Sequence, residues 1–282
     1  MNVVMEDNKM SKRLKIFYVI IILFCIIALT VAVVAQVQAS KQESAVATAE
    51  KISEEQLKKL KGDFSNIFEN KVNYLKDNNY KITKINPEKE IVYSGYQNND
   101  KKVSSYELDV NIPYINIKNE QTEKYNNEIK DIFEKKAKNI INSNNINTIY
   151  TVKYSAYVTN NILSLVIRST LKEDSNPQRD IIQTYNYDLT NQKECIMQDL
   201  LELRGITKQQ ANQAIKTEIE TVQKTIQGLE ELGLSVYARD PKSDIYSINN
   251  VTEYFIGQDN AIYIIFAYGN ENNTSEMDIV VM

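Results

Sequence analysis

The stretch YTVKYSAYVTNNILSLVIRST, residues 150–170, decides the fold class of this chain. Apolar side chains alternate with polar or small ones before the pair Asn160-Asn161, at Tyr150, Val152, Tyr154, Ala156 and Val158. Alternation with a period of two predicts a half-buried strand, because successive side chains of a strand point to opposite faces. Two asparagines between two such runs are typical of a tight turn. Residues 150–170 are therefore predicted to form an antiparallel β-hairpin.

Further strand and helix patterns precede this hairpin. Residues 105–112 alternate in the same way, residues 91–96 read as their hairpin partner, and Pro113 is expected to end the strand. Residues 120–142 carry apolar residues at helical spacing, and Asn119 is a suitable N-cap.

The chain after the hairpin continues with strands around one helix. A strand is expected over residues 180–189, and Thr207-x-x-Gln210 resembles a capping box that begins a helix ended at Gly233. Strands follow over residues 252–256, 261–268 and 277–281. The order predicts an α+β fold with mainly antiparallel sheets and packed helices over residues 81–282, with a possible subdivision near residue 144.

Residues 52–75 show an apolar stripe at spacings of three and four, which predicts a helix. Together with the polar stretch after residue 35, they form a tether and helix over residues 36–80. The stripe has two interpretations. It packs onto the following domain, or it forms a stalk through which the chain self-associates.

The apolar run IFYVIIILFCIIALTVAVVA, residues 16–35, has no charged residue and is long enough to span a bilayer as a transmembrane helix. Lys12, Arg13 and Lys15 precede it, so the positive-inside rule predicts a cytoplasmic tail at residues 1–15 and an extracytoplasmic C-terminal domain. The expected localisation is the cell membrane, in a single-pass orientation. A cleaved signal sequence is the competing interpretation, because Val37 and Ala39 before Ser40 resemble a signal-peptidase site.

The composition of the chain argues against several classes of function. Four of 33 basic and two of 37 acidic residues precede the apolar run, so the remainder carries a net charge near −6, which argues against nucleic acid as a partner. The chain has no histidine, so histidine-based catalytic and zinc sites are excluded. We expect no enzyme activity, cofactor or metal, and no catalytic residues.

Other reactive side chains have ordinary structural interpretations. Cys195, the cysteine outside the apolar run, is expected to be a buried apolar residue. Carboxylates are expected to be surface or turn residues, at Asp174, Asp180, Asp188 and Asp199. Strand tyrosines such as Tyr150, Tyr154, Tyr185 and Tyr187 are expected to pack in the core or in cross-strand pairs.

Three segments resemble a known family: VNIPYINIKNEQTEKYNNEIKDIFEKKAKNI (residues 110–140), YNYDLTNQKECIMQDLL (185–201) and TEYFIGQDNAIYIIFAYGNENNTSEMDIVVM (252–282). Together they are similar to the paired extracytoplasmic domains of RsiV-type anti-sigma factors and PdaC-type peptidoglycan deacetylases. The RsiV type implies a membrane-anchored receptor that binds lysozyme and is then cut by signal peptidase near the membrane. The chain departs from the family because residues 1–15 are short for a sigma-binding segment and no deacetylase catalytic domain follows.

Two functions are therefore expected at this point. The first is a membrane-anchored sensing or binding domain of the cell envelope, which binds lysozyme or peptidoglycan and is subject to proteolysis near the membrane. The alternative is a scaffold protein of an envelope complex that self-associates through residues 52–75.

Overall fold

The computed structural model describes residues 52–75, 78–144, 146–234, 236–268 and 276–282. The predicted tail at 1–15, the transmembrane helix at 16–35 and the site at Val37, Ala39 and Ser40 lie outside the described residues. Within the described ranges, no helix is both long and apolar enough to cross a membrane. From residue 51 onward the chain forms one compact unit.

The first sheet has eight strands, and the two strands of the predicted hairpin lie at its centre. In sequence order its strands are β1 (Lys71–Tyr74), β2 (Val92–Asn98), β3 (Lys101–Lys102), β4 (Tyr106–Ile115), β5 (Thr148–Thr159), β6 (Ile162–Glu173), β7 (Arg179–Asp188) and β8 (Lys193–Glu194). The hairpin turn has positive φ at Asn160 and Asn161, 48° and 63°, as a tight two-residue turn requires. This confirms the predicted turn and the strands on either side of it.

The first sheet is mixed, whereas the sequence predicted mainly antiparallel sheets. β4 runs parallel to the first half of β5, and β1 runs parallel to its second half. The remaining pairings of this sheet are antiparallel. The long helical connection between β4 and β5 makes the parallel pairing possible, since a parallel neighbour needs a crossover. The α+β class itself is confirmed.

Pro113 does not end its strand, contrary to the prediction. β4 continues to Ile115, and Pro113 lies opposite Ser94 next to a bulge in β2. Proline is tolerated at a bulge because the ladder hydrogen bonds are interrupted there. β5 pairs with β4 only as far as Val110, so this stretch has a single strand neighbour.

The second sheet has three antiparallel strands in the order β11 (Met277–Val281), β10 (Ile262–Ala267) and β9 (Glu253–Ile256). The helices are α2 (Glu54–Gly62), α3 (Glu120–Ile129), α4 (Lys135–Asn142), α5 (Met197–Leu203) and α6 (Lys208–Glu231), and a π-helical turn, Lys130–Glu134, joins α3 to α4. The predicted strands at the end of the chain and the predicted helices over 120–142 and after Thr207 are confirmed.

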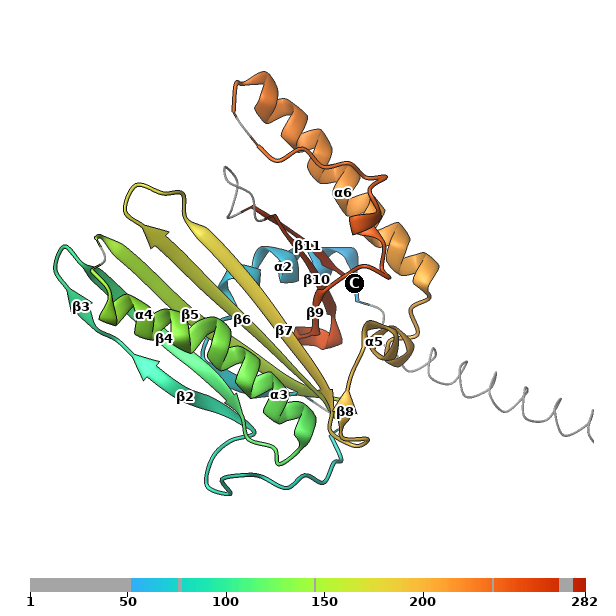
Figure 1. Ribbon diagram of the computed structural model, residues 1–282. Helices are drawn as coiled ribbons and strands as arrows, with labels where there is room; N and C mark the ends of the chain where they lie inside the picture. The colour runs from blue at the N-terminus through green and yellow to red at the C-terminus, as the bar shows by residue number, and fades with distance from the viewer. Residues whose placement is uncertain (1–51, 76–77, 145, 235, 269–275) are drawn as a thin grey trace, which may run out of the picture. The chain divides into compact units, whose positions relative to one another are not determined.

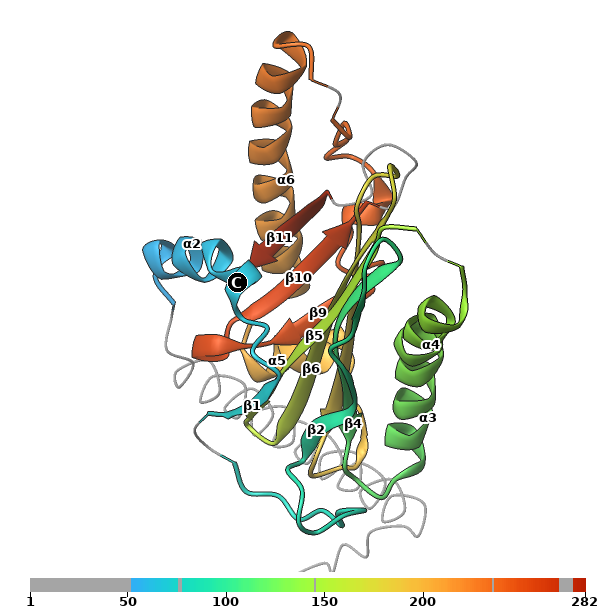
Figure 2. The same cartoon turned by 90° about the vertical axis from the view of Figure 1, so that its left-hand side faces the viewer.

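Side chains from these elements fill three cores. α3 and α4 cover one face of the first sheet and bury Tyr125, Ile129 and Phe133 (Figures 1 and 2). The second sheet and α2 pack against the other face. α5 and α6 cover the opposite face of the second sheet (Figure 2). The second sheet is therefore held between the first sheet and α6.

The predicted helix over residues 52–75 is wrong beyond Gly62, where α2 ends. Asn70 has a φ of 56°, and the chain then forms β1 beside β5. Apolar residues of the stripe are buried within the chain itself, at Leu60, Phe64 and Ile67. Spacing alone did not separate a helix from a short helix followed by a strand, because tertiary pairing with β5 decides the second half. Self-association through a helical stalk over residues 52–75 would need a continuous apolar helix face, which these residues do not form.

Candidate functional site

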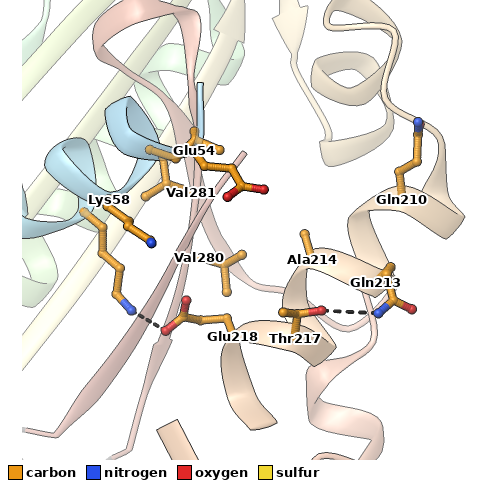
Figure 3. A pocket seen from close by; sticks show the side chains of 11 residues that line it. Glu54, Lys58, Gln210, Gln213, Ala214, Thr217, Glu218, Val280 and Val281 are labelled. Atoms are coloured by element: carbon orange, nitrogen blue, oxygen red, sulfur yellow. Dashed lines mark hydrogen bonds and ion pairs between the residues drawn. The ribbon is translucent and has the colours of Figure 1, made fainter. Parts of the chain in front are cut away.

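A groove of about 770 Å³ lies between α2 and α6, beside β11 (Figure 3). Each helix presents one face to it, because the lining positions recur at intervals of three and four residues. The residues that line the groove are Glu54, Leu57, Lys58 and Lys61 of α2, Gln210, Gln213, Ala214, Thr217 and Glu218 of α6, and Val280 and Val281 of β11.

α2 forms the first wall because its start is capped and its inner face is buried. The Ser53 side chain accepts a hydrogen bond from the Gln56 amide at 3.2 Å, and Glu54 and Glu55 lie at the positive end of the helix dipole. Leu60 is 5% exposed and belongs to the core between the two sheets. Its burial orients the groove face of α2 next to β11.

α6 forms the second wall, and a capping box fixes its start. The Thr207 amide donates to Gln210 Oε1 at 2.8 Å, and the Gln210 amide donates to Thr207 Oγ1 at 3.2 Å. Ile215 and Ile219 are fully buried against the second sheet. The positions beside them, Ala214 and Glu218, therefore face the groove.

The polar groups of the groove are largely balanced. Lys61 of α2 and Glu218 of α6 form an ion pair that joins the two walls (Figure 3). Gln213 Nε2 donates to Thr217 Oγ1 at 3.2 Å on α6. Val280, 3% exposed, gives the base of the groove an apolar surface. The site thus combines methyl groups at its base with amide, hydroxyl and paired charged groups on its walls.

A second, smaller hollow of about 440 Å³ lies over β1 and β2. It is lined by aromatic and polar side chains, among them Tyr74, Lys89, Glu90, Tyr93 and Gln97. Tyr74 is 51% exposed and donates a hydrogen bond to Glu90 Oε2 at 2.6 Å. Partial burial of the phenol, and then this hydrogen bond, raise the pKa of Tyr74 above its usual value. The exposed Tyr74 side chain is therefore an uncharged aromatic ring at neutral pH.

The residues considered from sequence occupy separate places in the fold. Arg168 pairs with Asp180 at 2.6 Å, while Asp188 accepts hydrogen bonds from the amides of Thr190 and Asn191. Asp199 accepts from the Ile196 amide and caps α5. Asp188 and Asp199 have the local turn and capping roles predicted for them, whereas the Asp180 side chain is only 3% exposed and is buried in its ion pair in β7, contrary to the prediction of a surface or turn residue. Among the described residues, no cluster of three or more histidine, cysteine or acidic side chains is arranged to hold a metal ion.

Cys195 and the strand tyrosines are buried, as predicted. Cys195 is 1% exposed, and burial raises the pKa of its thiol to about 12. The four strand tyrosines belong to the core under α3 and α4, at Tyr150, Tyr154, Tyr185 and Tyr187.

Sequence reasoning missed the groove itself. The ion pair across it joins residues 157 positions apart in the chain, and the strand beside it comes from the last six residues. The local signals, the capping box at Thr207 and the apolar stripe that begins at residue 52, identified α6 and α2 as helices but did not show that the two lie side by side.

Comparisons with known proteins give structural neighbours only. No protein-family profile and no curated protein sequence matches the chain. Among solved structures, it is similar to a member of the DUF3298 family from Bacteroides fragilis NCTC 9343, at 14% identity over 60% of this chain and 68% of that one, with a TM-score of 0.32. It is also similar to a DUF3298 family protein from Pseudomonas aeruginosa PAO1, at 9% identity over 72% of this chain and 90% of that one, with a TM-score of 0.40. The DUF3298 family is related to the RsiV-type and PdaC-type extracytoplasmic domains.

Proposed function

We propose that this protein is a membrane-anchored, extracytoplasmic binding domain of the cell envelope, and that it holds a protein ligand in the groove between α2 and α6. The observation that carries the proposal is the groove itself, with an apolar base at Val280 and hydrogen-bonding side chains on both walls. Partner proteins are commonly recognised through a segment that lies in a groove of this kind, between secondary-structure elements.

The chemistry of the groove favours binding over catalysis. Its lining has amides, methyl groups and one threonine hydroxyl, without a cysteine, and the chain contains no histidine to activate that hydroxyl. Lys61 and Glu218 neutralise each other across the groove, while Glu54 and Lys58 lie at exposed positions. Such groups are suited to hydrogen bonds and ion pairs with a partner.

The proposed ligand is a cationic protein, and lysozyme is the first to test. The net charge near −6 of the residues after the predicted transmembrane helix supports electrostatic attraction of a basic partner. The resemblance to RsiV-type receptors supports lysozyme in particular. In the sequence, α2 begins 15 residues after the predicted signal-peptidase site at Ala39.

The test is calorimetric titration of the full-length chain, in detergent, with lysozyme. We expect micromolar or tighter binding. Thr217→Trp places a large ring in the groove at an exposed helical position and should weaken binding at least tenfold. Thr225→Trp, two helical turns away and outside the groove lining, is the matched control and should bind like the unmodified chain. Equal weakening by both variants, or no binding of lysozyme by the unmodified chain, would contradict the proposal.

A glycan is the second candidate ligand, and the aromatic hollow favours it. A sugar packs its C–H face on an exposed ring, here Tyr74, while carboxylate and amide groups such as those of Glu90 and Gln97 hydrogen-bond its hydroxyls. Co-sedimentation of the full-length chain with insoluble peptidoglycan tests this reading. Tyr74→Ala should abolish co-sedimentation, and retention of the variant on peptidoglycan would remove the hollow as the glycan site.

A further inference from the structure

β11 is an edge strand, and its register shows which backbone groups face away from β10. Ile262 and Met282 exchange both backbone hydrogen bonds, at 2.9 and 3.0 Å. In an antiparallel ladder, hydrogen-bonded and non-bonded pairs alternate, so Val280 pairs with Ile264 through hydrogen bonds. The amide and carbonyl groups of Met277, Ile279 and Val281 consequently point outward from the sheet.

The opposite edge of the same sheet is closed by side chains of the first sheet. In β9 the outward groups belong to Tyr254 and Ile256. The Tyr254 amide donates to Thr184 Oγ1 at 3.0 Å, and its carbonyl accepts from Asn186 Nδ2 at 2.7 Å. The Ile256 amide donates to Ser164 Oγ at 3.2 Å. Three side chains therefore replace a neighbouring strand at this edge.

The β11 edge differs from the β9 edge in its hydrogen-bonding partners. Among the described residues, no side chain or strand hydrogen-bonds the outward groups of Ile279 and Val281. Backbone N–H and C=O groups are strong hydrogen-bonding groups, and an unpaired strand edge is a template for another strand. Among the residues that the structure describes, the β9 edge of this sheet has hydrogen-bonding partners and the outward groups of Ile279 and Val281 at the β11 edge have none.

This available edge lies beside the groove. Val281 lines the groove together with residues of α2 and α6, so a segment added beside β11 would lie between the two helices (Figure 3). Side chains of such a segment alternate between the two walls. On one side they meet Leu57 and Lys58, and on the other they meet the small side chains of Ala214 and Thr217.

We propose that the β11 edge receives an extended segment of the partner protein, which adds to the second sheet as a fourth strand. This inference rests on the proposed function and specifies how the groove holds its protein ligand. The segment alternates apolar side chains, which face Leu57, with small or polar ones, which face Thr217. Main-chain hydrogen bonds supply affinity in this mode of recognition, and the alternating side chains supply specificity.

The walls of the groove also limit the access of other strands to the β11 edge. Two helices flank it, and the Lys61–Glu218 ion pair joins them across the groove. Charged residues and covering helices are common protections of edge strands.

The test uses a displayed library of random heptapeptides, selected on the full-length chain in detergent and counter-selected on Thr217→Trp. Selected peptides are synthesised, and amide hydrogen exchange is measured with and without them. We expect the amides of Ile279 and Val281 to become at least tenfold more protected on binding. The Val280 amide, already bonded to β10, is the internal reference and should change much less.

A backbone substitution gives an independent readout. Val281→Pro removes one outward N–H without removing a hydrogen bond to β10, and should weaken peptide binding about tenfold. Val281→Thr keeps the N–H and should bind like the unmodified chain. Unchanged far-UV circular dichroism and melting temperature verify that the proline variant is folded, and the exchange measurement on the unmodified chain does not depend on that variant.

Three outcomes would overturn strand addition. The first is failure to enrich any peptide over Thr217→Trp, and the second is bound peptides that leave Ile279 and Val281 unprotected. The third is protection that rises with protein concentration in the absence of peptide, which would assign the edge to a second copy of the chain. If lysozyme still binds in a Thr217-dependent manner in any of these cases, the proposed function stands and only this binding mode fails.

Discussion

Asn186 closes the β9 edge, and replacing it with leucine should destabilise the fold. Asn186 is 5% exposed, donates to the Tyr254 carbonyl at 2.7 Å, and accepts from Ser164 Oγ at 2.6 Å. Asn186→Leu leaves the Tyr254 carbonyl without its donor and the Ser164 hydroxyl without its acceptor, and each unsatisfied buried group costs about 1–3 kcal/mol. We expect the free energy of unfolding to fall by about 3 kcal/mol.

The assay is thermal and urea unfolding followed by far-UV circular dichroism. For a domain of this size, a loss of about 3 kcal/mol corresponds to a fall of roughly 6–12 °C in Tm. Asn144→Leu is the matched control, because Asn144 is exposed in a loop and should change stability by less than about 0.5 kcal/mol. If Asn186→Leu is as stable as the control, side chains of the first sheet do not sustain the β9 edge.

Three further predictions concern buried polar groups. Arg239, 6% exposed, is paired with buried Asp278 at 2.9 Å, so Arg239→Met should lower the free energy of unfolding in urea by about 3–5 kcal/mol. Replacing Asp278 with asparagine in the same chain should recover part of that loss, because the unpaired charge is then removed. No recovery of stability would refute the pairing. Burial raises the pKa of Glu253 above its usual 4.5. The stability associated with protonated Glu253 is therefore present below pH 4.5 and is lost as pH rises through the raised pKa. Glu253→Gln should flatten the pH dependence of the free energy of unfolding above pH 4.5, and an unchanged slope would contradict a raised pKa of Glu253. The Cys195 thiol should resist a disulfide reagent in the folded chain at pH 8 and react after the chain is unfolded in urea. The measurement uses a Cys25→Ser background, so that Cys195 is the one thiol that reacts. Rapid reaction of the folded chain would contradict the burial of Cys195.

Local patterns predicted most elements of the fold. The alternation around Asn160-Asn161 identified the central hairpin, and the capping residues Asn119 and Thr207 identified the starts of two helices, because these signals depend on neighbours in sequence. The errors at Pro113 and beyond Gly62 have a different origin. In both places a partner strand distant in sequence determines the conformation, and hydrophobic spacing does not encode that partner.

The candidate site was much less predictable than the fold. Most of the side chains on its walls, such as Glu54, Lys58, Gln213 and Thr217, are at ordinary solvent-facing helix positions in the sequence. They become a groove only because Leu60 and Ile215 bury the opposite faces of the two helices in different cores. The availability of the β11 edge likewise follows from register, which was not deduced from the sequence.

The most direct test of the account is the titration of lysozyme onto the full-length chain beside its Thr217→Trp and Thr225→Trp variants. We expect micromolar or tighter binding that Thr217→Trp weakens at least tenfold and Thr225→Trp leaves unchanged. Binding that is the same in all three proteins, or absent from the unmodified chain, would contradict the claim that the groove between α2 and α6 is the site of a protein ligand.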